Sequence, residues 1–141
     1  MKNKITFLYG LGDRKEYKSL FKYFNIPKIN WNKSAITPPI GKVKILIGFS
    51  MGAILACEHA IKHKVETLVL CSMTTGVETL AKVRASGIIF LVGEKEKWVI
   101  KDMNRLGKDL KCDWRIIVIP KADHKIDILY RKAILDAIEQ K

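Results

Sequence analysis

Short, mostly apolar runs alternate with amphipathic stretches along this chain. Five such runs, each five residues long, cover residues 5–9, 43–47, 67–71, 88–92 and 115–119. Runs of this length with little polar alternation predict strands that are buried on both faces. Between them, apolar residues recur at spacings of three and four, as in helices that pack on a sheet. We therefore predict an α/β fold, a three-layer sandwich with a mostly parallel sheet of five or six strands.

The segment after the first strand predicts a capped helix. Asp13 can accept a hydrogen bond from the helix N-terminus, and Glu16 stands three residues later, at the spacing of a capping box. The following apolar residues fall on one helical face: Tyr17, Leu20, Phe21 and Phe24. Pro27 ends this helix. Residues 28–31 would then supply the sixth strand of the sheet.

Four further helices and one domain complete the expected architecture. The helices are predicted to begin near Ala53 and to cover residues 75–84, 99–110 and 126–138. The chain has 141 residues, enough for one compact domain and too few for two ordinary ones. We expect residues 1–141 to form a single domain.

Composition and cysteine content narrow the class of protein. Hydrophobic residues make up 48% of the chain and charged residues 28%, a balance typical of globular proteins rather than disordered ones. No apolar run approaches the roughly 20 residues of a membrane helix, so we expect no membrane anchor. Cys57, Cys71 and Cys112 are odd in number and far apart, which favours reduced thiols packed in the core. A cytoplasmic location follows as the expectation.

The net charge of +12 raises the question of nucleic-acid binding. Lysines greatly outnumber arginines, and they are dispersed singly along the whole chain. Proteins that read phosphate usually gather Arg, Lys and aromatic residues on one element. The dispersed lysines are better explained as a solvated surface, and we do not expect a nucleic-acid partner.

A Gly-Phe-Ser-Met-Gly sequence at residues 48–52 separates a predicted strand from a predicted helix. In this context the pattern is typical of a nucleophile elbow, a tight turn that lifts a serine hydroxyl clear of the backbone. The serine in such a turn has a positive φ, and side chains at Gly48 and Gly52 would collide with the neighbouring strand and helix. The sequence thus predicts Ser50 as a nucleophile.

Other reactive groups fall at the carboxyl ends of predicted strands, where the working residues of parallel sheets gather. Three loops carry them, at residues 10–12, 94–96 and 123–124. Serine, then acid, then histidine is the chain order of one class of serine hydrolases. These loops are therefore expected to meet beside Ser50.

Together these motifs resemble the α/β-hydrolase family of serine esterases and lipases, over nearly the whole chain. Residues 9–12 are similar to the family's oxyanion turn, in which a His-Gly pair is more usual. Residues 90–96 resemble its acid-bearing loop, with Glu96 where an Asp normally stands. Residues 118–124 resemble its histidine loop, which ends here at His124.

The resemblance implies a catalytic triad of Ser50, His124 and Glu96, and Glu94 or Asp123 are alternative acids. It also implies an oxyanion hole formed by the backbone N–H groups of Leu11 and Met51. No cofactor is implied. This set would make the protein a serine hydrolase that cleaves a small acyl ester or thioester through an acyl-enzyme.

Two departures from the family pattern leave a second hypothesis open. The sequence begins at the strand that carries the oxyanion turn, so we expect a minimal version of the fold. The segment between the strands at 67–71 and 88–92 is short, which predicts an open site without a lid. The absent strands and the Glu at residue 96 motivate the alternative, a catalytically silent, hydrolase-like binding protein. The oligomeric state is open.

Three remaining residues have several interpretations. His59 and His63 stand four apart and could share a helix face, but no third ligand accompanies them. We expect no metal site and expect both histidines to face solvent. Trp98 either lines the open site or anchors its own helix.

Overall fold

A five-stranded parallel sheet forms the centre of this computed structural model, which describes residues 5–33, 38–73 and 80–139. Every neighbouring pair of strands is parallel, and the strands lie in the order in which they occur in the chain. The strands are β1 (Ile5–Leu8), β2 (Ile45–Phe49), β3 (Val65–Cys71), β4 (Ala85–Gly93) and β5 (Asp113–Ile119). The prediction of a parallel sheet is confirmed, with five strands.

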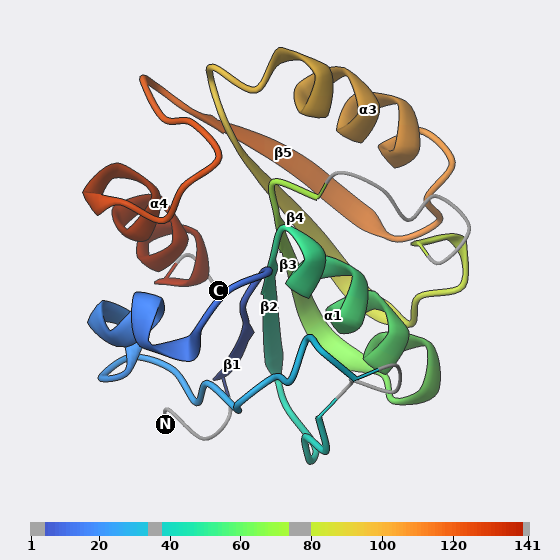
Figure 1. Cartoon of the computed structure of the whole chain (residues 1–141). Coiled ribbons are helices and arrows are strands. Elements are labelled where there is room, and N and C mark those ends of the chain that lie inside the picture. The colour runs from blue at the N-terminus through green and yellow to red at the C-terminus, as the bar shows by residue number, and fades with distance from the viewer. Residues whose placement is uncertain (1–4, 34–37, 74–79, 140–141) are drawn as a thin grey trace.

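Helices cover both faces of the sheet. They are η2 (Arg14–Leu20), a 3₁₀ helix, and the α-helices α1 (Met51–Lys62), α3 (Lys97–Gly107) and α4 (Ile128–Glu139). The helices α1 and α3 lie on one face, whereas η2 and α4 lie on the other (Figure 1), which confirms the three-layer sandwich. Within the described ranges, none of the helices has the length and hydropathy needed to cross a bilayer. Of the helix predicted over 75–84, residues 75–79 lie outside the described residues, and Leu80 and Ala81 are helical.

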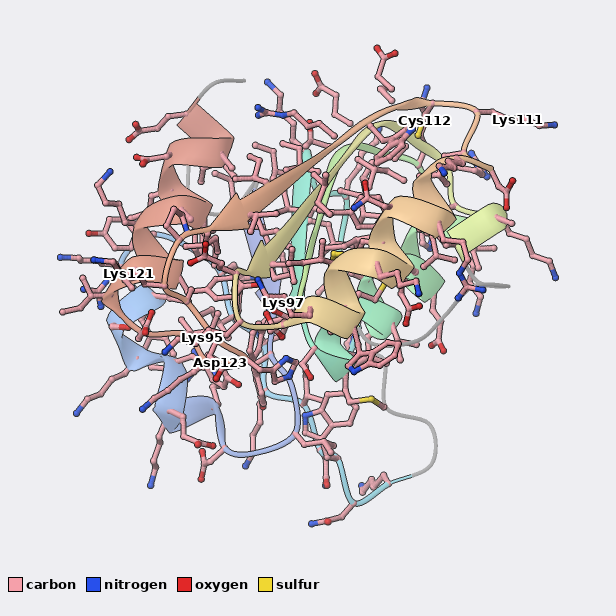
Figure 2. All side chains as sticks on the ribbon, turned by 90° about the horizontal axis from the view of Figure 1, so that it is seen from above. Lys95, Lys97, Lys111, Cys112, Lys121 and Asp123 are labelled. Atoms are coloured by element: carbon pink, nitrogen blue, oxygen red, sulfur yellow. The ribbon has the colours of Figure 1, made fainter. Side chains whose placement is uncertain are left out.

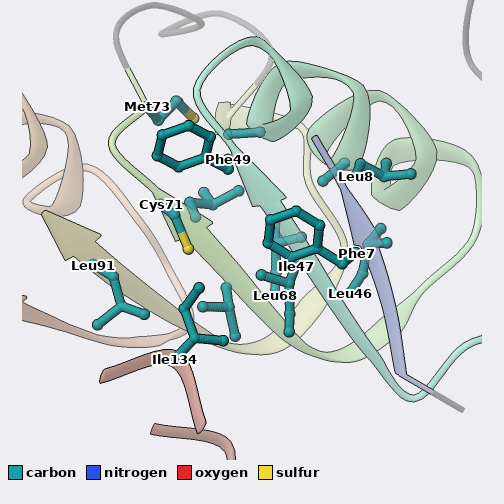
Figure 3. Close-up of a cluster of buried hydrophobic side chains, with 14 of the residues drawn as sticks. Phe7, Leu8, Leu46, Ile47, Phe49, Leu68, Cys71, Met73, Leu91 and Ile134 are labelled. Atoms are coloured by element: carbon teal, nitrogen blue, oxygen red, sulfur yellow. The ribbon is translucent and has the colours of Figure 1, made fainter. Parts of the chain in front are cut away.

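The core consists of the apolar runs that predicted the strands. All five residues of β2 are buried, and β3 is buried except for one position near its start, as expected for strands covered on both faces. By contrast, β5 is an edge strand, and all of its positions except the last are exposed or half-buried. Figure 3 shows part of the buried core, with Phe7, Ile47, Cys71 and Leu91 on the strands and Ile134 on α4.

The sixth strand expected at residues 28–31 is absent, and that prediction was wrong. A single bridge takes its place at the free edge of β1. There Phe7 N donates to Asn25 O at 2.9 Å, and Asn25 N donates to Ile5 O at 3.0 Å. Pro27 follows two residues later and has no N–H to continue the ladder, so pairing stops. A short piece of backbone thus covers part of an otherwise open sheet edge.

The helix predicted after Asp13 forms as a 3₁₀ helix with a kink at Tyr17 rather than as a regular α-helix. Its capping box is confirmed, since Lys15 N donates to the Asp13 carboxylate at 3.0 Å and Asp13 N donates to Glu16 at 2.7 Å. The kink lets the Tyr17 ring pack 5.7 Å from that of Phe7. Packing against the sheet therefore overrides helical regularity here.

His59 is buried, with 7% of its surface exposed, and the expectation that it faces solvent was wrong. It lies four residues after Leu55, which places it on the same buried face of α1. His63 caps the helix and is exposed, and the two rings lie 4.9 Å apart. Burial, together with His63, lowers the pKa of His59. Among the described residues, no three His, Cys, Asp or Glu side chains gather as a metal site requires.

Two glycines allow α1 to pack closely against β1 and β2, as the elbow pattern predicts. A Cβ atom at Gly52 would overlap the carbonyl oxygen of Leu8. One at Gly48 would lie 2.5 Å from the Cα atom of Ala53. Both are backbone contacts that cannot shift alone, so the turn from strand to helix requires glycine at both positions.

The substitution Gly52→Ala tests this close approach. We expect it to lower the free energy of unfolding by about 2 kcal/mol or more, because the added methyl group must displace backbone. Urea unfolding followed by circular dichroism measures the change. The control Gly41→Ala adds the same methyl where nothing lies within 4 Å and should change stability by less than about 0.5 kcal/mol. Equal stabilities for the two variants would contradict the packing argument.

Candidate active site

Ser50 stands at the turn between β2 and α1 with φ of 57° and ψ of −122°. The positive φ is the conformation that the elbow pattern predicts. Ser50 N donates to Cys71 O at 2.8 Å, which ties the turn to the end of β3. Gly10 lies alongside, because a Cβ atom there would be 3.1 Å from that of Ser50. The serine is thus held at the carboxyl edge of the sheet, next to the turn that follows β1.

The loops after β4 and β5 lie against each other at this same edge. Lys95 N donates to Ala122 O at 3.0 Å, and Lys121 N donates to the Glu94 carboxylate at 2.9 Å. Figure 2 shows Lys95 and Lys121 on these neighbouring loops. The contact joins the segment with the predicted acid to the segment with the predicted histidine.

His124 links Ser50 to Glu96 through both of its ring nitrogens. His124 Nε2 lies 2.9 Å from Ser50 Oγ, and His124 Nδ1 lies 2.6 Å from Glu96 Oε1. The Phe49 ring packs 5.1 Å from the imidazole. The side chain of Glu96 is 4% exposed and that of His124 is 39% exposed, so the acid is inside and the histidine is at the mouth of the site.

The two alternative acids are engaged elsewhere. Glu94 accepts the N–H of Lys121. Asp123 accepts the backbone N–H of His124 at 2.8 Å, which leaves it beside the histidine but bound to its main chain. Among the three candidate carboxylates, Glu96 is the one that lies within hydrogen-bond distance of the His124 ring.

The pairing of Glu96 with His124 shifts both groups toward their charged forms. Burial raises the pKa of Glu96, but hydrogen bonds from His124, Ser72 and Gly93 N–H outweigh it and hold the pKa below its ordinary value. The hydrogen bond to Glu96 raises the pKa of His124 above its ordinary value, against the opposing effect of burial. When the ring is neutral, Nδ1–H donates to Glu96, so Nε2 is free to accept the Ser50 proton.

A cavity of about 450 Å³ opens beside the Ser50 hydroxyl. Its walls come from the turn after β1, from η2, from the elbow and from the loop before α4. The lining residues are Gly10, Leu11, Glu16, Tyr17, Phe49, Ser50, His124, Lys125 and Ile126. Met51 is the first residue of α1, where a backbone N–H has no partner within the helix. Leu11 therefore lines the same cavity as Ser50, and Met51 directly follows Ser50 in the chain.

Two residues at this site were missed by sequence reasoning. Ser72 Oγ donates to Glu96 Oε2 at 2.6 Å, and the Tyr130 hydroxyl lies 2.7 Å from Ser72 Oγ. Ser72 directly follows β3, so the rule that working residues follow strand ends could have found it. No signal marked Tyr130, which belongs to the apolar pattern of α4. Trp98 is 79% exposed and is not among the cavity-lining residues.

The architecture is that of the α/β-hydrolase fold. No protein-family model matches the sequence, and no curated protein matches it. Among solved structures, a dienelactone hydrolase from Anabaena variabilis superimposes with a TM-score of 0.71 and 16% identity, over 95% of this chain and 83% of that one.

Two further solved structures are similar to this chain. An esterase, PE8, superimposes with a TM-score of 0.69 and 14% identity, over 96% of this chain and 91% of its own. An α/β-hydrolase enzyme from the metagenome of sediments of the Mar Chica lagoon in Morocco has a TM-score of 0.66 and 14% identity, over 96% and 88%. At these identities the likeness establishes the fold.

The His124 ring reports on its carboxylate partner. We expect its pKa, measured by NMR titration of the ring protons, to lie above the ordinary value of about 6.5. In Glu96→Gln the pKa should fall by about one pH unit or more, because the charge that favours the imidazolium is gone. The matched control Glu94→Gln should leave it unchanged. If the His124 pKa fell further in Glu94→Gln than in Glu96→Gln, the pairing of His124 with Glu96 would be contradicted.

Proposed function

We propose that the protein is a serine hydrolase that cleaves a small acyl ester or thioester through a triad of Ser50, His124 and Glu96. The observation that carries the proposal is the continuous hydrogen-bonded series from Ser50 Oγ through the imidazole to a buried carboxylate. The similar solved structures, a dienelactone hydrolase and esterases, support a hydrolase. The geometry matches the general requirement for an activated serine, a base in contact with the hydroxyl and an acid in contact with the base.

In the proposed reaction, Ser50 Oγ attacks the carbonyl carbon while its proton passes to His124 Nε2. The resulting imidazolium gives that proton to the leaving alcohol or thiol as the C–O or C–S bond breaks, which leaves Ser50 acylated. Water then attacks the acyl-enzyme and loses a proton to His124 Nε2. That proton returns to Ser50 Oγ as the acid product departs. Glu96 stabilises the imidazolium at both stages and remains ionised.

The oxyanion of each tetrahedral intermediate would be bound by the backbone N–H groups of Leu11 and Met51. Met51 begins α1, so the positive end of the helix dipole faces the same point. The closeness of Gly10 to Ser50 supports this arrangement, because a Cβ atom at Gly10 would lie 3.1 Å from that of Ser50, so the turn after β1 runs beside the proposed nucleophile. Loss of one such donor costs about 3 kcal/mol of barrier in enzymes of this kind.

The size and lining of the cavity support a substrate with a small acyl group. Its volume of about 450 Å³ lies within the range of small-molecule sites, and its walls combine apolar Leu11, Phe49 and Ile126 with charged Glu16 and Lys125. Of the segment in which a lid would be inserted, between the strands predicted at 67–71 and 88–92, residues 74–79 lie outside the described residues. A small, hydrolytically simple substrate such as a p-nitrophenyl ester is therefore the appropriate first probe.

Covalent labelling tests the nucleophile. A fluorophosphonate probe should form one adduct on Ser50 of the wild-type protein, detected by intact-mass and peptide mass spectrometry. Ser50→Ala should abolish the adduct and lower kcat for p-nitrophenyl acetate by more than about 10³-fold. Ser86→Ala is the matched control, since Ser86 is exposed at the start of β4, and it should label normally. No adduct and no Ser50-dependent turnover would favour the catalytically silent binding protein instead.

The pH dependence of hydrolysis follows from the His124 pKa. The base must be neutral to accept the Ser50 proton, so kcat/KM should rise with pH as the imidazolium deprotonates. Because Glu96 raises the pKa of His124, the inflection should lie above about 6.5, and activity should be lost as pH falls through it. Initial rates between pH 5 and 9 measure this. An inflection near the ordinary carboxylate pKa of about 4 would contradict the assignment of the base.

A further inference from the structure

The Glu96 carboxylate has a second set of hydrogen bonds on the side away from His124. Glu96 Oε2 accepts from Ser72 Oγ at 2.6 Å and from Gly93 N–H at 2.8 Å. Behind Ser72, the Tyr130 hydroxyl lies 2.7 Å from Ser72 Oγ and 3.0 Å from Leu91 O. Ser72 and Tyr130 are both completely buried. Burying two hydroxyl groups next to a carboxylate costs folding free energy unless each hydroxyl hydrogen has an acceptor.

The number of hydrogens on each group determines which group donates along the row of hydrogen bonds from Tyr130 through Ser72 to Glu96. The ionised carboxylate has no hydrogen, so the single proton of Ser72 must point to Glu96 Oε2. The contact between Ser72 and Tyr130 then requires the Tyr130 proton, which burial keeps on the phenol by raising its pKa. The Tyr130 hydroxyl also lies within donating distance of Leu91 O, at 3.0 Å, but Ser72 Oγ is nearer, at 2.7 Å, and Leu91 O keeps the backbone N–H of Ser72 as a donor in either case. The order is therefore Tyr130 to Ser72 to Glu96, with every donor directed toward the carboxylate.

The backbone around Ser72 fixes the position of the Ser72 side chain beside Glu96. Ser72 has φ of 48°, in the left-handed region that non-glycine residues seldom adopt. Its N–H is bound to Leu91 O of β4, and the preceding residue, Cys71, accepts the N–H of Ser50 through its carbonyl. One short segment at the end of β3 thus contacts both the nucleophile and the acid. The Tyr130 side is fixed by the Phe49 ring, which packs edge-on at 5.6 Å.

We propose that Ser72 and Tyr130 are positioning residues, whose hydroxyl groups orient the Glu96 carboxylate so that Oε1 faces His124 Nδ1. The effect on catalysis rests on the proposed hydrolase function, whereas the effect on His124 itself does not. Without the Ser72 hydroxyl, Glu96 loses a donor that favours its ionised form and its orientation. The imidazolium then loses part of its stabilisation, so His124 becomes a weaker base.

Other charged and titratable groups lie around Glu96 and His124, on the loop before α4, at the end of β3 and on η2. Asp123, on the loop before α4, also raises the pKa of His124. Cys71, at the end of β3, is buried, and burial raises the pKa of its thiol, so that it stays neutral beside Tyr130. Glu16 of η2 and Lys125 line the cavity next to the imidazole. None of these is altered by the substitutions below, so the shifts measured can be assigned to the two hydroxyl groups.

The test removes each hydroxyl with little change of shape, through Ser72→Ala and Tyr130→Phe. The pKa of His124, followed by NMR, should fall in Ser72→Ala and fall less in Tyr130→Phe, because tyrosine acts through the serine. In the double variant the pKa should equal that of Ser72→Ala. For p-nitrophenyl acetate, kcat/KM at its pH plateau should drop roughly ten-fold in Ser72→Ala, the effect of one hydrogen bond to a charged group. The inflection of the pH profile should move down with the His124 pKa.

Two controls separate positioning from a structural role. Tyr23→Phe and Ser86→Ala remove hydroxyl groups at half-buried and exposed positions, and neither should change the His124 pKa. If Ser72→Ala does not fold, Tyr130→Phe decides the question, since it removes one atom and keeps the ring packing. An unchanged or raised His124 pKa in folded variants overturns the proposal. If the wild-type protein hydrolyses no ester, the hydrolase proposal fails, while the His124 titration still decides the role of the two hydroxyl groups.

Discussion

The close approach of the β2–α1 turn to the backbone of β1 is the constraint on which the rest of the site depends. Without a side chain at Gly52, the first turn of α1 can lie against the Leu8 carbonyl, and the chain passes into the helix through the positive φ of Ser50. This turn places the serine hydroxyl at the carboxyl edge of the sheet. The Phe49 ring, on the strand side of the same turn, packs against both His124 and Tyr130.

Glu96 shows how hydrogen bonds can stabilise the ionised form of a buried carboxylate. Burial by itself disfavours the ionised form of Glu96, and the carboxylate is held by three donors, His124, Ser72 and Gly93 N–H, that together reverse this effect. Donors from three different elements converge on one side chain, so its charge depends on the tertiary structure around it. Glutamate in place of the more usual aspartate is accommodated because its two oxygens reach different partners, one toward the histidine and one toward Ser72.

The sheet, the elbow and the order of the chemical groups along the chain could be read from the sequence, whereas several local features could not. The apolar runs predicted all five strands, although β2 ends two residues later than expected because its pairing with β3 continues through Phe49. Residues 28–31 have strand-like composition but follow Pro27, and Tyr9 binds both the N–H and the carbonyl of Ile29 in place of a neighbouring strand. His59 looked solvent-facing because polarity alone does not reveal which face of α1 meets the protein interior.

The features that follow from the amino-acid sequence alone are therefore periodic or local: buried strands from continuous apolar runs, helices from three- and four-residue spacing, and a strand-to-helix turn from two glycines around Ser50. Only the folded chain shows which of the three carboxylates lies against His124, and that Ser72 and Tyr130 lie behind that carboxylate. The physical reason is that periodicity is set by neighbours in the chain. A hydrogen bond of fixed length between residues far apart in sequence depends instead on how the loops at the strand ends pack together.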